Sequence, residues 1–511
     1  MPNATYQVHV DWERNANYTG TYDNISPYVR NIRAFTGFRE PFTSVAGEQT
    51  LTIELDNSDR RFSPEYSSSP LYGYRFSGRP IRVQAINSGT TVLWTGVTST
   101  ITPQTGRNGE KRAILQATGM KRYLDKAEVK IPIQIGKRTD EIIQAVVESV
   151  PYAEPLVSGP WSVGVVGYSE IGNSTYIGTG VLSTSLDTGV LIPSYAGDKW
   201  KDGVTAYEAI RQVVESERGK WFFNRSGVGV FWNRTRLLQD YTTDATYTDS
   251  QFIQTDYVYG DGVKNAVICK FYPREVETGE SIVWQLEKPL TVNAGTEKKL
   301  RARFGDQNSD ERLSVINPVR PRENTVDFVA TGTGYLISWK ADAVGAEMVF
   351  VAPAGDFTIN TLVIRGQRLT SYSPAEVSAV NGESVFYEGR QEIAFNLQLI
   401  DDALQAQTIA DYEISRRSSA SGYMRSVTLL NRDATTLAAV INRTVGDRIR
   451  VIETQTNHDR GYFIIGEELE IDNAGKTHQV TWFLEPANNN AYWLIGVSGY
   501  SEIGQTAIVA P

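Results

Sequence analysis

The sequence contains one cysteine, three histidines and no long apolar run among its 511 residues. The single cysteine, Cys269, excludes an internal disulfide, and its place in the apolar segment NAVICKF predicts a thiol buried in a strand. The first residues, MPNATYQVHVDWER, lack the basic start and the apolar core of about seven residues that a secretory signal requires. No segment approaches the roughly 18 apolar residues of a membrane helix. We therefore expect a chain that is made in the cytoplasm, has no membrane span and is stabilised by packing and assembly.

Metal ligands and clusters of basic residues are also scarce. His9, His458 and His478 are not spaced with cysteine or acidic residues as metal ligands usually are, so the sequence predicts neither a metal site nor a cofactor. The formal net charge is -9, and the lysines and arginines are scattered along the chain. Because no basic stripe is present to displace counterions from phosphates, sequence-specific nucleic-acid binding is not expected.

Residues typical of β-proteins are abundant. Hydrophobic residues make up 41% of the chain and aromatic residues 11%, and the 43 glycines come with many serines and threonines. This composition favours strands and turns over long helices, and the length predicts three or four domains. The predicted fold class is mainly β with a few helices, of the α+β type, in a multidomain chain.

Four domains are predicted from the order of the patterns. Residues 1–128 hold six alternating segments joined by short polar turns, which predicts a small β-barrel-like domain. Residues 129–262 predict an α+β domain of helices and a hairpin, with an inserted β-arm at 152–185. Residues 263–371 predict a β-sandwich-like domain. Residues 372–511 predict a helix and a second β-barrel-like domain, which ends in a terminal β-arm.

The clearest local pattern lies in residues 186–238. Apolar residues first recur at helical spacing, with Thr205 or Asp202 as the expected cap and Gly219 as the expected left-handed stop. The aromatic runs WFF and VFW follow, separated by RSGVG, and predict a β-hairpin that buries its apolar face against the helix. No acid, base or nucleophile is concentrated there, so we interpret this stretch as scaffold.

A twelve-residue segment occurs twice in the chain. WSVGVVGYSEIG at 161–172 and WLIGVSGYSEIG at 493–504 agree at nine of twelve positions. The identical GYSEIG tips suggest an arm that docks on another subunit, and packing on the same chain is the alternative. The residues predicted to make such contacts are Trp161, Tyr168, Ile171, Trp493, Tyr500 and Ile503.

Two short motifs imitate known binding sites. Residues 56–59 begin like a calcium loop, but Arg61 and Ser67 stand where glycine and glutamate are required, which favours an Asx-rich turn. Residues 475–477 resemble the end of a phosphate-binding loop, but Glu470 stands where its first glycine is needed, and a strand is predicted to follow. Neither motif predicts a ligand site.

Paired carboxylates are the remaining candidates for chemistry. Asp11 with Glu13, or Glu467 with Glu470, could imitate the acids of a glycosidase, but that chemistry depends on a separation in space that the sequence does not give. No catalytic residue is predicted and we expect no enzyme. A carbohydrate-binding adhesin or glycosidase stays open as an alternative.

Nine segments follow one another in a recognisable order. They are DNSDRRFSP, GRPIRV, TDEIIQAVVESV, AYEAIRQVVESERGKWFFNRSGVGVFWNR, YGDGVKNAV, YEGRQEI, VGDRIRV, GYFIIGEELEI and HQVTWFLEP. Their order resembles that of the tail hub proteins, also called baseplate hub or tail-tip proteins, of tailed bacteriophages and related injection machines. The resemblance touches nearly the whole chain and depends on the order of the elements, since no single motif is diagnostic.

The resemblance implies a structural protein of the virion tail, made in the host cytoplasm. It implies a homotrimer whose two barrel-like domains per chain alternate around a ring. Such a ring would continue the tail tube, bind the tube or distal tail protein and other tail-tip proteins, and pass the tape measure protein and then DNA. The net charge of -9 fits a wall that repels a polyanion. The nearest alternative is the distal tail ring protein, which would assemble as a hexamer.

Overall fold

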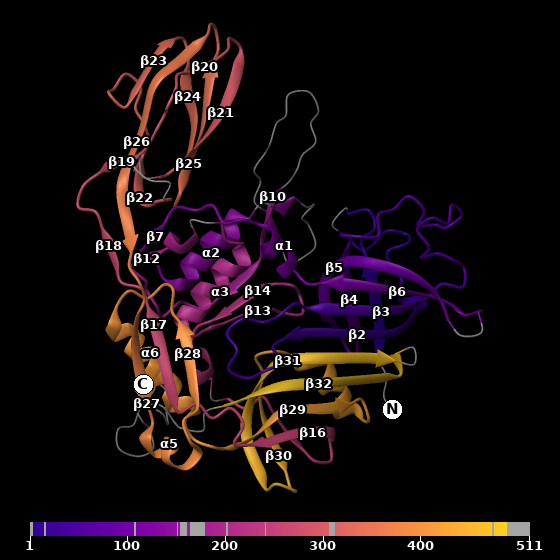
Figure 1. The fold of residues 1–511 in the computed structure, drawn as a ribbon. Helices are drawn as coiled ribbons and strands as arrows, with labels where there is room; N and C mark the ends of the chain where they lie inside the picture. The colour runs from indigo at the N-terminus through magenta and orange to yellow at the C-terminus, as the bar shows by residue number, and fades with distance from the viewer. Residues whose placement is uncertain are drawn as a thin grey trace.

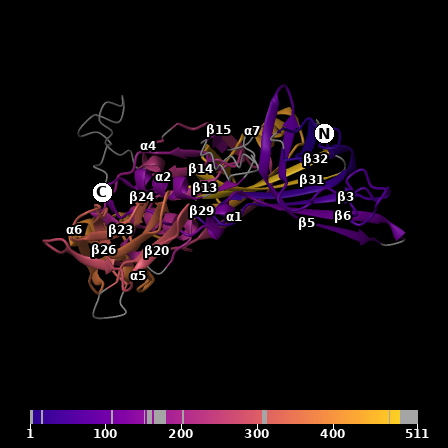
Figure 2. The ribbon, with the colours of Figure 1, turned by 90° about the horizontal axis from the view of Figure 1, so that it is seen from above.

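The computed structural model describes residues 4–14, 17–106, 109–150, 152–153, 161–163, 179–200, 203–240, 242–305, 312–472 and 475–487. Strands far outnumber helices, so the predicted mainly β, α+β class is confirmed. The molecule is elongated, with a β-sandwich at one end, helices below it and a large sheet that projects to one side (Figures 1 and 2). None of the helices in the described ranges is both long and apolar enough to cross a membrane.

The large sheet has twelve strands and is built from both ends of the chain. Its main path runs β1-β4-β5-β6-β3-β2-β31-β32-β29-β16, and β30 joins it at β31 and carries β15. The N-terminal strands are β1 (Thr5–Val10), β2 (Val29–Gly37), β3 (Thr50–Asp56), β4 (Pro80–Ile86), β5 (Thr90–Thr105) and β6 (Lys111–Thr118). The others are β15 (Ala245–Thr248), β16 (Phe252–Tyr259), β29 (Gly422–Leu430), β30 (Arg448–Glu453), β31 (His458–Asp472) and β32 (Thr477–Pro486).

The two halves of this sheet meet where β2 and β31 pair antiparallel. The register runs from Ile32 opposite Ile471 to Gly37 opposite Gly466. β31 is 15 residues long, so one of its edges pairs first with β30 and then with β2, while the other edge pairs with β32. Apolar side chains from both halves belong to one core. The first and last β-rich regions of the chain are therefore a single packed unit.

The structure differs from the two small barrel-like domains expected from the sequence. No closed barrel occurs among the described strands, and those of the first and last regions lie on one open path. Alternating apolar residues show which face of a strand is buried, but the backbone groups at a strand edge are the same for any partner. The pairing of β2 with β31 was therefore not visible in the pattern. The four domain boundaries stay a proposal.

The helix and hairpin predicted from residues 186–238 are present next to the large sheet. α2 (Thr139–Ser149) and α3 (Ala206–Glu217) share one apolar core with the hairpin of β13 (Lys220–Phe223) and β14 (Gly229–Trp232). β11 (Thr184–Leu186) pairs in parallel with β14. This layer connects the large sheet to the sandwich (Figure 1).

The two ends of α3 only partly follow the prediction. Thr205 caps the helix, and its hydroxyl oxygen accepts a hydrogen bond of 3.2 Å from the backbone N–H of Glu208. The left-handed residue at the other end is Arg218, with φ 63°, and not Gly219. Glycine is required at 219 for a different reason, since a Cβ there would lie 2.5 Å from the carbonyl oxygen of Trp232.

The sandwich surrounds its own apolar core with two sheets. In one sheet the long β26 (Phe357–Ser371) pairs with β18 (Arg274–Val276), β19 (Ser281–Gln285), β20 (Leu290–Val292), β22 (Ser314–Val319) and β23 (Phe328–Gly332). The other has the order β21 (Thr296–Arg303), β25 (Gly345–Ala352) and β24 (Tyr335–Asp342).

A third layer lies below the sandwich in Figure 1. Here β17 (Ala266–Phe271) lies between β27 (Ala375–Val380) and β28 (Glu392–Asn396), and α6 (Ala403–Arg417) packs on this sheet. Cys269 is buried in β17, as expected, and burial raises the pKa of its thiol to about 12. The remaining elements are α1 (Lys121–Lys126), β7 (Gln134–Ile135), β8 (Tyr152–Ala153), β9 (Trp161–Val163), β10 (Thr179–Leu182), β12 (Tyr195–Ala196), α4 (Arg236–Gln239), α5 (Gly382–Glu388) and α7 (Ala434–Asn442).

The junction of the two halves can be tested at Gly466. A Cβ at this position would lie 1.9 Å from the carbonyl oxygen of Phe38, so Gly466→Ala must push β2 and β31 apart. We expect this substitution to lower the free energy of unfolding by roughly 2–4 kcal/mol, measured by thermal and urea unfolding. Gly47→Ala is the matched control, because Gly47 is exposed and a Cβ there meets nothing within 4 Å. Equal unfolding midpoints for the two variants would contradict the described junction.

Candidate functional site

The contact residues predicted from the repeated segment are almost entirely outside the described ranges. Trp161 is the first residue of β9, which pairs with β10. Tyr168, Ile171, Trp493, Tyr500 and Ile503 lie outside the described residues. The prediction that these residues contact another subunit therefore stays a prediction.

The structure places a different group of residues together, at the point where the large sheet meets the helices. Its centre is Glu485, near the end of β32, whose side chain is fully buried. One carboxylate oxygen accepts hydrogen bonds from the backbone N–H of Phe42 (2.7 Å) and from Lys220 Nζ (2.8 Å). The other accepts a hydrogen bond from Arg416 Nη2 (2.9 Å). This carboxylate thus joins the last described strand to the loop after β2, to the hairpin and to α6.

A second buried carboxylate lies next to the first. Glu413 of α6 accepts a hydrogen bond from Arg218 Nε at 2.8 Å, and the Arg417 guanidinium approaches its other oxygen at 3.8 Å. The Arg218 guanidinium also lies 4.0 Å from the ring centroid of Phe395. We call Glu413, Glu485, Arg218, Lys220, Arg416 and Arg417 the ionic cluster.

Burial and charge shift the pKa values of the ionic cluster. Desolvation alone would raise the pKa of Glu485, but Lys220 and Arg416 outweigh it and lower that pKa to about 2. The pKa of Glu413 is lowered in the same way, with Arg218 as the main cause against desolvation. Desolvation lowers the pKa of Lys220 and of Arg417, in spite of their carboxylate neighbours. Four cationic groups around two carboxylates therefore leave the cluster with an excess of positive charge.

Local structure explains how these side chains converge. The left-handed turn at Arg218 ends α3 and starts the hairpin, so Arg218 and Lys220 are held at one place. The loop after β2 pairs with this hairpin, since the Trp221 N–H donates to the Ser44 carbonyl and the Ala46 N–H to the Trp221 carbonyl, each at 2.8 Å. Arg416 and Arg417 end α6, where the helix dipole favours cations.

A second buried ion pair fixes the tip of the hairpin to the large sheet. Arg225 donates to both carboxylate oxygens of Glu467 in β31, at 2.6 and 2.5 Å. Its remaining N–H groups donate to the carbonyls of Ile441 (2.6 Å) and Arg443 (2.8 Å), at the end of α7. A guanidinium that donates four hydrogen bonds in fixed directions restricts the arrangement of these three elements.

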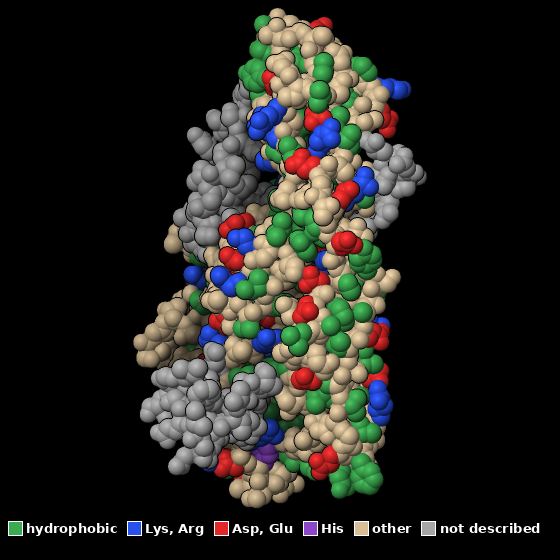
Figure 3. All heavy atoms as spheres, turned by 90° about the vertical axis from the view of Figure 1, so that its left-hand side faces the viewer, with side chains coloured by type: hydrophobic (Ala, Val, Ile, Leu, Met, Phe, Trp, Pro, Cys, Tyr) green, Lys and Arg blue, Asp and Glu red, His purple; other side chains and the backbone are tan. Residues whose placement is uncertain are grey.

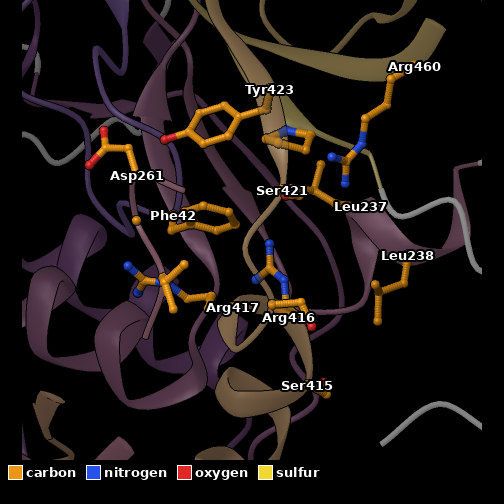
Figure 4. Close-up of a pocket in the computed structure, with 14 residues that line it drawn as sticks. Phe42, Leu237, Leu238, Asp261, Ser415, Arg416, Arg417, Ser421, Tyr423 and Arg460 are labelled. Carbon is orange, nitrogen blue, oxygen red and sulfur yellow. The ribbon is translucent and has the colours of Figure 1, made fainter. Parts of the chain in front are cut away.

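A cavity of about 290 Å³ opens beside the ionic cluster. Figure 4 shows Arg416, Arg417 and Arg460 around it, with the rings of Phe42 and Tyr423. The full lining is Phe42, Leu237, Leu238, Asp261, Gly262, Val263, Ser415, Arg416, Arg417, Ser419, Ser421, Tyr423, Arg460 and Pro486. The cavity therefore combines cationic groups, hydroxyls and an apolar wall.

The other sequence candidates have structural partners. His458 Nε2 lies 2.6 Å from the Tyr462 hydroxyl, and His478 Nδ1 lies 2.8 Å from the Tyr6 hydroxyl. Burial lowers the pKa of His478 to about 3, so its ring is neutral. No group of three or more possible metal ligands occurs within the described ranges.

The motif at 56–59 and the carboxylates of Glu467 and Glu470 form turns and ion pairs within the fold. Residues 56–59 form Asx turns, in which Asp56 accepts a hydrogen bond from the Ser58 N–H and Asp59 one from the Arg61 N–H, each at 2.9 Å. Glu467 is buried with Arg225, whereas the Glu470 carboxylate is partly exposed and pairs with Arg33. A spacing of three residues in one strand places Glu467 and Glu470 on opposite faces of β31.

Sequence reasoning did not identify the ionic cluster. A usable signal was present, because ESERGKWFF and HQVTWFLEP place charged residues directly beside runs that are expected to be buried. Buried charges require partners, so these positions could have been predicted to be paired. Which charge meets which was not predictable, because the partners come from distant parts of the chain.

Comparison with known proteins adds structural likenesses. No family model and no curated protein matches the sequence. The 43 kDa tail protein of prophage MuSo2 from Shewanella oneidensis is similar at 9% identity and a TM-score of 0.48, over 94% of this chain and 98% of that one. The tail protein from Neisseria meningitidis MC58 is similar at 9% identity and a TM-score of 0.45, over 95% and 97%. A prophage tail protein from Listeria monocytogenes EGD-e is similar at 8% identity and a TM-score of 0.38, over 94% of both chains.

Each of these three structures is a tail protein. At such identities and TM-scores the likeness is a loosely shared arrangement of elements. No residue role passes from those proteins to this chain.

The ionic cluster can be tested at Glu485. Glu485→Gln leaves Lys220 and Arg416 buried without a countercharge, so we expect a loss of roughly 3–5 kcal/mol of stability, measured by urea unfolding at neutral pH. Glu470→Gln is the control, because Glu470 forms a partly exposed pair that contributes about 1 kcal/mol or less.

The pH dependence of the stability difference between the wild type and Glu485→Gln tests the same carboxylate. The pKa of Glu485 in the folded protein is about 2, below the value of about 4.3 of an unfolded glutamate, so its contribution is complete above pH 4.3 and is lost as the pH falls toward 2. The stability difference between the wild type and Glu485→Gln should therefore shrink across that window. A difference that stays constant from pH 5 to pH 2 would contradict this assignment.

Proposed function

We propose that this chain is the structural hub of a phage-like tail tip, which forms a ring that continues the tail tube. The proposal includes three copies per ring, contact with the tube or distal tail protein and passage of the tape measure protein and DNA. It adds no catalytic step. The order of the nine sequence segments suggested this role, and the arrangement of the large sheet supports it.

The observation that carries the proposal is the antiparallel joining of two β-rich regions, one from each end of the chain, at the β2–β31 junction. Outward from the junction the order is β2, β3, β6, β5 on one side and β31, β32, β29, β16 on the other. Six strands come from residues 5–118 and six from residues 245–486. On both sides the strand next to the junction strand is the one that follows it in the chain. Beyond this first step the two orders differ, because β6 follows β3 in the chain whereas β29 precedes β32.

Two similar wall segments in one chain fit a six-fold tube. Three copies would present six segments, so a trimer could sit on a six-fold cylinder without a change of symmetry at the boundary. The wall segments would need to be stiff, and the shared apolar core joins the two halves.

The charge of the surface agrees with a passage that does not bind DNA. Lysine and arginine are interspersed with aspartate and glutamate on the face seen in Figure 3, without an extended area of one sign. The net charge of -9 agrees with a passage whose wall repels a polyanion.

The number of copies in the native assembly tests the proposal. We expect native mass spectrometry of the purified full chain to give three times the chain mass of 56.8 kDa. Six copies would support the distal tail ring instead, and a single copy that hydrolyses a polysaccharide would support the glycosidase alternative. An image of the trimer with a lumen lined mainly by lysine and arginine would contradict passage of DNA along a repelling wall.

We also propose that the repeated arms contact a neighbouring subunit. Tyrosine side chains at interfaces commonly contribute 1–3 kcal/mol, so the double variant Tyr168→Ala with Tyr500→Ala should raise the concentration at which the trimer dissociates by at least tenfold. Mass photometry over a dilution series measures this shift. Tyr72→Ala is the control, because Tyr72 is exposed and lies outside both arms. If the double variant dissociates like the control, the arms pack on their own chain.

A further inference from the structure

The cavity beside the ionic cluster has one cation with few partners of its own. Arg416 is well satisfied, since its guanidinium donates to the Tyr412 hydroxyl (3.0 Å) and to Glu485 (2.9 Å). The Arg417 side chain is nine-tenths buried, yet its nearest carboxylate, Glu413, lies 3.8 Å away and its Nε has no hydrogen-bond partner among the described residues. Arg218 engages one oxygen of Glu413, and the other oxygen, which faces Arg417, has no hydrogen-bond partner among the described residues. Arg417 is therefore a buried cation with a weak counterion.

A second cation that lines the cavity, Arg460, also has few hydrogen-bond partners. Arg460 of β31 donates through Nη1 to the Gly422 carbonyl at 3.3 Å, and its Nε also has no hydrogen-bond partner within the described ranges. Asp261 lies on the other side of the cavity (Figure 4) but forms its ion pair with Arg425. The acidic group on the cavity wall thus leaves both Arg417 and Arg460 available to a ligand.

The energetics favour an anion at this place. A buried guanidinium costs several kcal/mol unless charged hydrogen bonds compensate for the water it has lost. The ionic cluster contains four cations and two carboxylates, and the pKa of Arg417 is lowered by desolvation and by Arg218 and Arg416. A negative group in the cavity would relieve this repulsion.

The apolar wall distinguishes between anions. The Arg417 guanidinium lies 4.9 Å from the ring centroid of Phe42, and the lining continues through Leu237, Val263 and Pro486. A hydrated phosphate gains little from such a wall. A carboxylate on a short hydrocarbon stem gains both the ion pair and the burial of its methylene groups.

From this geometry we propose that the cavity is a carboxylate-binding site, in which Arg417 and Arg460 hold the charged group and Phe42 packs against its hydrocarbon stem. The source of the carboxylate is a glutamate side chain of a bound peptide segment or a free dicarboxylic acid. The site does not depend on the proposed hub function, because it follows from this chain's own charges.

Thermal unfolding of the full chain tests the site. Glutarate should raise the unfolding midpoint in a saturable way when it replaces chloride at constant ionic strength. Arg417→Gln should weaken the apparent affinity at least tenfold, whereas Arg390→Gln, which removes an exposed arginine paired with Glu392, should leave it unchanged. A blocked peptide with one glutamate separates the two sources: tighter binding of the peptide indicates a protein segment, and equal or tighter binding of glutarate indicates a free acid.

A second measurement uses only the wild-type chain, so it does not depend on whether a variant folds. Phenylglyoxal modifies arginine side chains, and peptide mass spectrometry reports the rate at each position in the wild-type chain. Saturating glutarate should slow the modification of Arg417 and Arg460 severalfold and leave Arg390 unaffected. Equal rates with and without glutarate, or an unfolding midpoint that responds to inorganic phosphate as strongly as to glutarate, would overturn the proposal.

Discussion

The antiparallel pairing of β2 with β31 is the constraint on which the rest of the structure depends. It places the loop that follows β2 against β13, and the same loop gives the Phe42 N–H to Glu485. Glu485 lies near the end of β32, which in turn pairs with β31. Hydrogen bonds therefore connect β2 to β31, β31 to β32, β32 to the loop after β2, and that loop to the β13–β14 hairpin. A change at any one of these contacts moves the others.

Buried ion pairs fix the relative positions of these connected elements. Buried ion pairs are weak evidence for net stability, because desolvation offsets much of the attraction between the charges. Their effect here is to select partners, since Glu485 and Glu413 each find their cations on several separate elements. An apolar replacement would fill the same space but would accept several relative positions of α6, the hairpin and the sheet.

The ionic cluster, which has an excess of positive charge, lies beside the cavity that is proposed to bind a carboxylate. The ionic cluster holds α6 against the sheet, and the same helix end carries Arg417 to the cavity wall. A ligand at Arg417 would also act on Glu413, and through it on Arg218 at the end of α3. Binding in the cavity is thereby coupled to the contact between two layers of the fold. The antiparallel joining of two β-rich regions in the large sheet is a separate property of the fold.

The sequence alone determined the fold class, the helix and hairpin of residues 186–238, the buried thiol of Cys269 and the resemblance to phage tail proteins. These follow from periodicity, turn residues and the order of segments, all of which are local. Only the tertiary structure decided that β2 pairs with β31, that the expected barrels are halves of one open sheet, and that Glu485 meets Lys220 and Arg416. The physical reason is that strand edges and buried charges select partners by position in space, and those partners lie from 69 to more than 400 residues away in the chain.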